Sequence, residues 1–175
     1  HRFLSANGRF VLYTGDPDAG QPVLRRDLDI ATDVPLPTAA RAVARGMSAD
    51  GGRVLLGVSG AVAGLRTLYS VAGAPPEASV IRITITCAAR DGLGYLSGTL
   101  SDDGNVVVFP WEAGRGSGAP LPAPPVGLGI FDASLGQTDC HALNAPDVAA
   151  IGAVYAGSAD GGVIAFPVAL TSGGS

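Results

Sequence analysis

The sequence predicts an all-β protein built from repeated small antiparallel sheets, and three observations carry that prediction. The 175 residues include 26 Gly and 13 Pro, which divide the chain into short segments joined by turns. A short phrase recurs along the chain, each time a turn signal followed by an apolar run. No segment has the periodicity of a long helix, and we expect at most one helical turn, over residues 39–44.

The repeated phrase consists of Ser, an Asx-Gly turn signal and an apolar strand. It reads LSANGRFVLYTG from Leu4, MSADGGRVLLGV from Met47, LSDDGNVVVFPW from Leu100 and GSADGGVIAFPV from Gly157. Asn-Gly and Asp-Gly accept the positive φ angles of tight turns, so each copy predicts strand, turn and strand. We also expect the Ser or Asp side chain to bond backbone amides within the turn.

The segment after each phrase repeats more loosely. QPVLRRDLDIATDVPLP (21–37) aligns with VGLGIFDASLGQTDCHAL (126–143), and each runs from a strand through Asp27 or Asp132 to a short turn and another strand. LRTLYSVAGAPPEASVI (65–81) occupies the same place, with Ser70 instead of Asp. The overlapping IRITITCAA alternates Ile with Arg or Thr, which predicts a strand with one solvent-facing side.

The spacing of the phrases predicts the architecture. Their serines are Ser5, Ser48, Ser101 and Ser158. These separations match the roughly 40–50 residues of one four-stranded propeller blade, with insertions in the later units. We therefore predict one domain, 1–175, that is a β-propeller of four-stranded antiparallel blades, about three and a half to four in number. Its units fall near 1–43, 44–96, 97–147 and 148–175.

The longest insertion is rich in Pro and Gly and covers residues 112–127. We expect it to be a surface loop between the second and third strands of its blade, because the repeat continues on both sides of it.

The repeat resembles the TolB-type β-propeller repeat, whose signature is a Ser-x-Asp-Gly turn, an apolar strand, and a strand ending in Asp-Leu and a turn. The first unit, LSANGRFVLYTG…VLRRDLDIATDVPL, matches over its whole length, and the second and third match best at their turns. The last copy is also similar to WD40-like and quinoprotein-type blades. The resemblance implies a propeller in a periplasmic or extracellular location. It implies structural turn residues, so we assign no catalytic, cofactor-binding or metal-binding residue and no cofactor.

The sequence opens almost on Ser5, without the strand that should precede it, and stops soon after the fourth apolar strand. Three arrangements are open: the end strands complete one split blade, the chain is a piece of a longer propeller, or oligomerisation closes the ring. An array that stayed unclosed would expose bare sheet edges.

Charge and hydropathy limit the partners. All 11 basic residues are Arg and the net charge is −4, with no basic stripe, so we expect no nucleic-acid partner. No run approaches the roughly 18 apolar residues of a membrane span. Cys87 and Cys140 form no CxxC pair, and two alternatives are open for them: a disulfide in an oxidising compartment, or two buried thiols.

Two metal sites are conceivable from residue types alone. His1 and His141 are the two histidines, and an N-terminal His with a second His is the pattern of a copper brace. The competing interpretation is that His1 is a cleavage or tag remnant and His141 a loop residue. Acidic pairs in turns, at 16 and 18 or at 102 and 103, offer Ca²⁺ ligands, but acids in Gly/Pro turns are usually turn formers.

Other chemistry has weaker signals. GRGSG (114–118) is close to the Gly-x-Ser-x-Gly motif of a nucleophile elbow. It lies in a Pro-rich loop, however, and His141 would be the only internal histidine to act as its base. Gly127 and Gly129 lack the third glycine and the helix of a dinucleotide loop, and more simply permit close sheet packing. The aromatic residues can line a groove or fill space between blades, and we favour packing. They are Trp111, Tyr13, Tyr69, Tyr95 and Tyr155.

The function that these observations favour is a non-catalytic binding or scaffold module, which docks a protein or small ligand through blade loops or the central channel. Self-association is a further expectation. Two alternatives are the propeller domain of a secreted hydrolase or lyase whose catalytic part lies elsewhere, and a small copper protein that uses His1.

Overall fold

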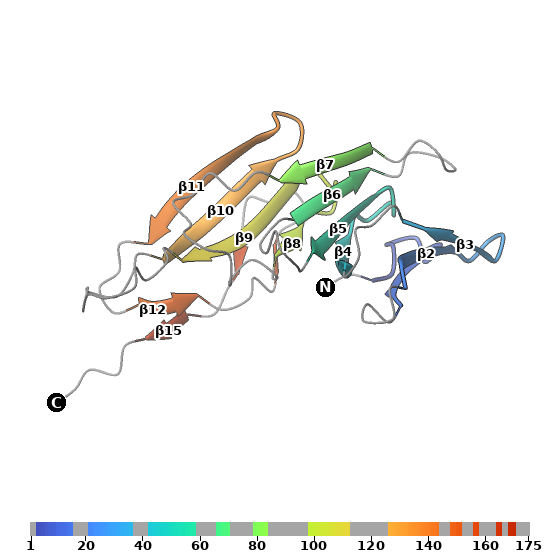
Figure 1. Cartoon of the computed structure of the whole chain (residues 1–175), viewed down its shortest axis with the longest axis horizontal. Helices are drawn as coiled ribbons and strands as arrows, with labels where there is room; N and C mark the ends of the chain where they lie inside the picture. The colour runs from blue at the N-terminus through green and yellow to red at the C-terminus, as the bar shows by residue number, and fades with distance from the viewer. Residues whose placement is uncertain are drawn as a thin grey trace.

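The strands of the chain form antiparallel sheets, and this confirms the all-β prediction (Figure 1). The structure is a computed structural model in which no helix occurs among the described residues. The described residues are 3–15, 21–36, 42–58, 66–70, 79–83, 98–112, 126–143, 148–151, 156–157, 164–165 and 168–170.

The first sheet contains β1 (Phe10–Thr14), β2 (Val23–Asp27) and β3 (Thr32–Pro35) in sequence order. A remnant of a preceding strand lies beside β1. Leu4 pairs with Val11 as an isolated bridge, and the Phe3 carbonyl accepts a 2.8 Å hydrogen bond from the Leu12 amide. This bridge lies outside the named strands, so β1 is the first strand among the described residues, in agreement with the expectation from the sequence.

The second and third sheets are complete four-stranded meanders. The second contains β4 (Ala42–Met47), β5 (Arg53–Val58), β6 (Arg66–Ser70) and β7 (Ser79–Ile83). The third contains β8 (Thr99–Leu100), β9 (Val106–Glu112), β10 (Val126–Asp132) and β11 (Gln137–Leu143).

The segment before β4 and the insertion after β9 were both given expected structures from the sequence. The helical turn expected at 39–44 is wrong for its described part, because Ala42 to Ala44 begin β4. The Pro/Gly-rich insertion joins β9 to β10, the second and third strands of its sheet, as expected. Asp27, Ser70 and Asp132 are the last residues of β2, β6 and β10, which confirms the looser repeat.

The last strands form two short ladders. β12 (Val148–Ile151) pairs with β15 (Val168–Leu170), and β13 (Ala156–Gly157) pairs with β14 (Ile164–Ala165). The outer pair, β12 with β15, and the inner pair, β13 with β14, follow the order of a single β-hairpin.

One register is common to all four repeated phrases. The residue before each Ser pairs with the residue six positions after that Ser. The pairs are Leu4 with Val11, Met47 with Val54, Leu100 with Val107, and Gly157 with Ile164. Since register fixes which side chains face which side of a sheet, the four phrases place equivalent residues in equivalent positions.

The core lies between neighbouring sheets. β5 is buried on both faces, since Val54, Leu55 and Leu56 are all 0% exposed. One cluster joins the first two sheets, and its members are Leu12, Val23, Leu36, Ala42, Ala44, Met47, Val54 and Leu56. Burial of each Val or Leu side chain contributes about 1.5–3 kcal/mol, so apolar contact between sheets is the main force that stacks them.

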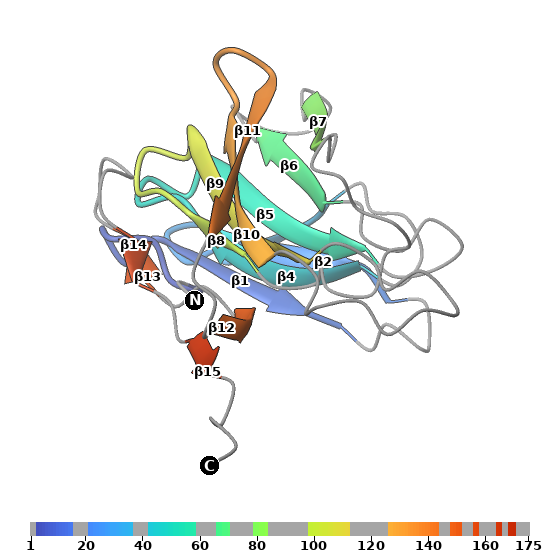
Figure 2. The same cartoon turned by 90° about the vertical axis from the view of Figure 1, so that its left-hand side faces the viewer.

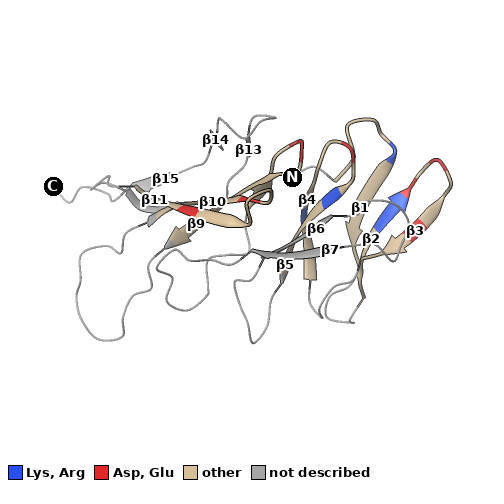
Figure 3. Cartoon of the chain, turned by 90° about the horizontal axis from the view of Figure 1, so that it is seen from above, with Lys and Arg blue, Asp and Glu red and all other residues tan. Residues whose placement is uncertain are grey.

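The sheets form an open row. Seen from above, they follow one another from β1–β3 at one end to β9–β11 near the other (Figure 3). A view along the row shows them one behind another (Figure 2). Figure 1 shows β3 and the β12–β15 ladder at opposite ends of the molecule. The first strands β4 and β8 contact each other and lie on the same lower side, which we call the inner edge.

Candidate functional site

The turn of the second phrase is held by its own Ser and Asp side chains. Ser48 Oγ donates to Asp50 Oδ1 at 2.6 Å and accepts from the Arg53 amide at 2.9 Å. The Asp50 carboxylate also accepts from the Gly52 amide at 2.8 Å, and Gly51 has a φ of 75°. The left-handed conformation explains the glycine, because other residues adopt it at a cost.

The other described turns repeat this network. Ser5 Oγ donates to Asn7 Oδ1 at 2.6 Å, and Ser101 Oγ donates to Asp103 Oδ1 at 2.5 Å. Gly8 and Gly104 have φ angles of 73° and 75°. The expected hydrogen bonds of the Ser and Asx side chains within their turns are therefore observed.

The turn carboxylates are kept ionised by these bonds. The serine hydroxyl is the main cause that lowers the pKa of Asp50 and of Asp103, followed by a backbone amide. Asp132 behaves alike at the β10–β11 turn, where its pKa is lowered mainly by the Ser134 hydroxyl. Each of these acids accepts at least two hydrogen bonds within its turn through Oδ1.

Neighbouring turns are joined to one another. The Ala6 amide donates to the Ala49 carbonyl at 2.7 Å, and the Ala49 amide donates to the Asp102 carbonyl at 2.7 Å. An arginine from the preceding sheet reinforces each joint. Arg25 donates to the Gly51 carbonyl at 2.8 Å, and Arg53 donates to the Gly104 carbonyl at 3.1 Å.

The largest described polar cluster lies at the first joint. The guanidinium carbons of Arg9 and Arg25 stand 4.9 and 4.5 Å from the centre of the Phe10 ring, within cation–π range. Arg9 also donates two hydrogen bonds to the Asp27 carboxylate, from Nη2 to Oδ2 at 2.7 Å and from Nε to Oδ1 at 3.1 Å. This contact is the main cause that lowers the pKa of Asp27. The cluster is engaged within itself, so we interpret it as structural.

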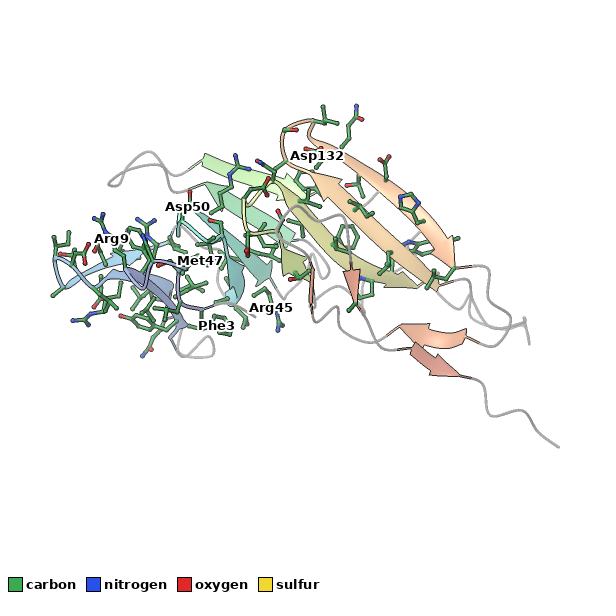
Figure 4. All side chains as sticks on the ribbon, turned by 180° about the vertical axis from the view of Figure 1, so that it is seen from behind. Phe3, Arg9, Arg45, Met47, Asp50 and Asp132 are labelled. Atoms are coloured by element: carbon green, nitrogen blue, oxygen red, sulfur yellow. The ribbon has the colours of Figure 1, made fainter. Side chains whose placement is uncertain are left out.

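Arg45 differs from these arginines. Ala44 pairs with Leu56 and Gly46 with Leu55, so Arg45 is the extra residue of a β-bulge in β4. Its Nε is buried, and among the described residues Arg45 has no hydrogen-bond or carboxylate partner. Burial lowers its pKa. Figure 4 shows the side chain at the inner edge, on the same side of the molecule as Phe3.

Sequence reasoning missed Arg45. A bulge commonly redirects a side chain near a functional site, but the bulge depends on the pairing of β4 with β5 and has no motif of its own. The available signal was a charged residue beside a glycine in the otherwise apolar AVARGM.

The sequence candidates are scattered in the structure. His141 is exposed on β11, opposite Leu128, and Asp102 offers its backbone carbonyl to the next turn. Within the described ranges no group of three or more His, Cys, Asp or Glu side chains gathers to hold a metal ion. His1, Asp16, Asp18, Cys87 and residues 114–118 lie outside the described residues.

The glycines of β10 serve packing. Gly127 pairs with Trp111 and Gly129 with Phe109, and a Cβ on either glycine would meet the partner's ring, at 2.5 and 2.3 Å. The two rings lie across the bare backbone, as the packing interpretation predicted. Trp111 is 7% exposed, which also fits packing, although its Nε1 has no hydrogen-bond partner among the described residues.

The tyrosines are less informative. A hydrogen bond with Asp33 raises the pKa of Tyr13, which is half-buried. Tyr69 is in β6, but its side chain is outside the described part of the structure, as are Tyr95 and Tyr155.

Cys140 is disulfide-bonded, and the chain's one other cysteine is Cys87. The described portion of the chain contains no helix long and apolar enough to cross a membrane.

Solved structures share the fold of this chain. No protein-family model matches it, and no curated protein is significantly similar in sequence. A putative TolB from Agrobacterium tumefaciens matches 81% of the chain with a TM-score of 0.53 and 23% identity, over 48% of its own length. TolB from Acinetobacter baumannii matches 78% with a TM-score of 0.50 and 20% identity, over 30% of its length.

An enzyme gives a comparable match. The oligogalacturonate lyase of Vibrio parahaemolyticus matches 81% of the chain with a TM-score of 0.59 and 15% identity. The chain spans 39% of that lyase, and thus less than half the length of each of the three proteins. At these identities the likeness concerns the fold alone. The repeated turns, the stacked four-stranded sheets and these matches together show a partial β-propeller of TolB-like blades.

Proposed function

We propose that this chain is a non-catalytic binding module that docks an anionic group of a protein or small ligand at the inner edge of its blades. The blades of a closed propeller surround a central channel, and we take the inner edge, where the first strands β4 and β8 contact each other, as the side that would face it. Arg45 is the observation that carries the proposal.

A half-buried guanidinium loses solvation, and no carboxylate of the described residues compensates Arg45 for that loss. A ligand carboxylate would offset that loss by accepting charge-assisted hydrogen bonds from the planar guanidinium group of Arg45. The overall charge of −4 does not attract anions, so such binding has to be local.

The test uses fluorescein-labelled tetraglutamate and tetraglutamine, with binding followed by fluorescence anisotropy at low salt. We expect tetraglutamate to bind and tetraglutamine not to bind. Arg45→Ala should weaken tetraglutamate binding at least fivefold. Arg26→Ala is the matched control, because Arg26 is 43% exposed and already lies 3.5 Å from Asp33. Equal affinity of the parent and Arg45→Ala chains would overturn the proposal.

We also propose a periplasmic or extracellular location. The disulfide at Cys140 supports it, because disulfides persist in oxidising compartments and are rare in the cytosol. Cell fractionation with an antibody against the chain tests this, and recovery of the protein in the cytosolic fraction alone would contradict it.

A further inference from the structure

β11 is the outermost strand of the third sheet, whose strands follow the order β11-β10-β9-β8. Its residues pair with β10 in one unbroken register, from Val126 with Leu143 to Asp132 with Gln137. Figure 1 shows β11 along the margin of its sheet, on the side opposite β8. The outer edge of β11 lies in the plane of its own sheet, so its place at the margin does not depend on the sheets that pack against the two faces.

This outer edge lacks features that usually keep an edge strand from pairing with another chain. Edge strands are commonly short, or they carry Lys, Pro or a bulge. β3, the outer strand of the first sheet, follows that rule, since it has four residues and ends at Pro35. β11 has seven residues without Pro, Lys or Arg, and it pairs with β10 without a bulge. Its backbone can therefore serve as a template for a further strand.

The sequence of β11, QTDCHAL, is self-complementary about Cys140. When two copies run antiparallel with Cys140 opposite Cys140, Asp139 of each copy stands opposite His141 of the other. No other antiparallel register of β11 with itself brings these two residues opposite each other. Cross-strand neighbours of opposite charge stabilise a sheet, and an imidazole N–H can donate a hydrogen bond to a carboxylate.

We propose that β11 pairs with β11 of a second copy of this chain, antiparallel and centred on Cys140, so that their third sheets join into one. Such an interface is isologous, because each copy contributes the same strand, and it closes after two copies. The remaining opposite pairs are Thr138 with Ala142 and Gln137 with Leu143, and neither brings like charges together. The pairing uses the backbone of Cys140, so it requires no thiol there.

The charge on β11 indicates why the partner is a second copy. Asp139 discourages a partner strand that offers no complementary group, whereas a second copy supplies His141 at the matching position. The pairing goes beyond the proposed docking of an anion and does not rest on it. Arg45 is at the inner edge with β8, at the opposite side of the third sheet from β11. Either proposal can therefore fail without the other.

Charge complementation between two variants tests the pairing. His141→Asp places two carboxylates opposite each other in both pairs of the symmetric dimer. Asp139→Lys replaces the carboxylate opposite His141 with a cation. Each variant alone should dimerise at least fivefold more weakly than the parent in sedimentation equilibrium at low salt, because like charges opposite each other destabilise a sheet. A mixture of the two variants restores an acid opposite a base in both pairs, so the mixed dimer should return to within about threefold of the parent affinity.

Two further measurements complete the experiment. Ser134→Asp is the matched control for His141→Asp, because it adds a negative charge in the exposed β10–β11 turn, outside the paired strand. It should leave the dimerisation within about twofold of the parent. Amide hydrogen exchange of the parent needs no variant, and exchange along β11 should slow as the protein concentration rises. A parent that stays monomeric at micromolar concentrations, β11 amides that exchange independently of concentration, or a mixture that associates no more tightly than the separate variants would each disprove the pairing.

Discussion

Asp50 and Asn7 occupy the same position of equivalent turns, and each accepts a hydrogen bond of 2.6 Å from its serine. The chain therefore contains its own example of a neutral residue in this role. We predict that Asp50→Asn stays within about 0.5 kcal/mol of the parent in its free energy of unfolding at pH 7. Asp50→Ala should lose about 1–2 kcal/mol, because the Ser48 hydroxyl and the Gly52 amide lose their acceptor.

The same pair of variants has an expected pH dependence. The pKa of Asp50 is lowered in the folded chain, so its ionised form stabilises the fold above the unfolded value of about 3.9. That contribution is lost as the pH falls through the folded pKa. Urea unfolding at pH 7 and pH 3 should show a smaller loss in Asp50→Asn than in the parent. An equal loss in both would mean that the Asp50 carboxylate does not contribute to stability.

At the scale of an element, β10 depends on two residues that lack side chains. A Cβ on Gly129 would lie 2.3 Å from the Phe109 ring, so Gly129→Ala forces the ring or the strand to move. We predict a loss of about 1–3 kcal/mol in urea unfolding, as for other overpacked cores. Gly46→Ala in β4 is the control, since its nearest neighbour would be the Leu100 Cβ at 4.0 Å. Similar losses in both variants would contradict the packing role of Gly129.

The joint between the first two sheets depends on Arg25 of β2. This side chain is 7% exposed and donates to the Gly51 carbonyl of the next sheet. Since hydrogen bonds to charged groups contribute about 1.5–3 kcal/mol, Arg25→Met should lower stability by a similar amount. Arg26→Met on the same strand should change it by less than about 0.5 kcal/mol, because an exposed ion pair contributes little. Thermal unfolding of the two variants distinguishes them.

Local chemistry explains which elements could be predicted from the sequence. Ser48, Asp50 and Gly51 bond one another within a few residues, so their spelling alone indicates a turn between strands. The Arg45 bulge and the rings over β10 could not be predicted, because both arise from pairing between strands. The hydrophobic periodicity of a sequence indicates a strand, but it does not show which residues of two strands pair with each other. Sequence correctly associated Gly127 and Gly129 with close packing, but only the pairing identifies Trp111 and Phe109 as the residues that approach them.

At the scale of the whole molecule, the repeat explains the stacking but not the ends. Each sheet buries its faces against its neighbours, and Val54, Leu55 and Leu56 are fully covered only because sheets lie on both sides. The first sheet has a neighbour on one side, so Leu4 stays exposed. An open row of this kind gains stability from whatever covers its end and from any covalent link within it.

The disulfide of Cys140 supplies such a link, and its contribution to stability is the last prediction. Cys87 is the one other cysteine, and closing a loop of this length restricts the unfolded chain, which stabilises a fold by about 2–4 kcal/mol. Cys140→Ser should therefore lose about 2–4 kcal/mol in urea unfolding. Cys87→Ser should match it, and dithiothreitol should lower the parent to the same level while leaving both variants unchanged. A parent whose stability is insensitive to dithiothreitol would show that the link contributes nothing, and the stacked sheets would then hold the row without covalent help.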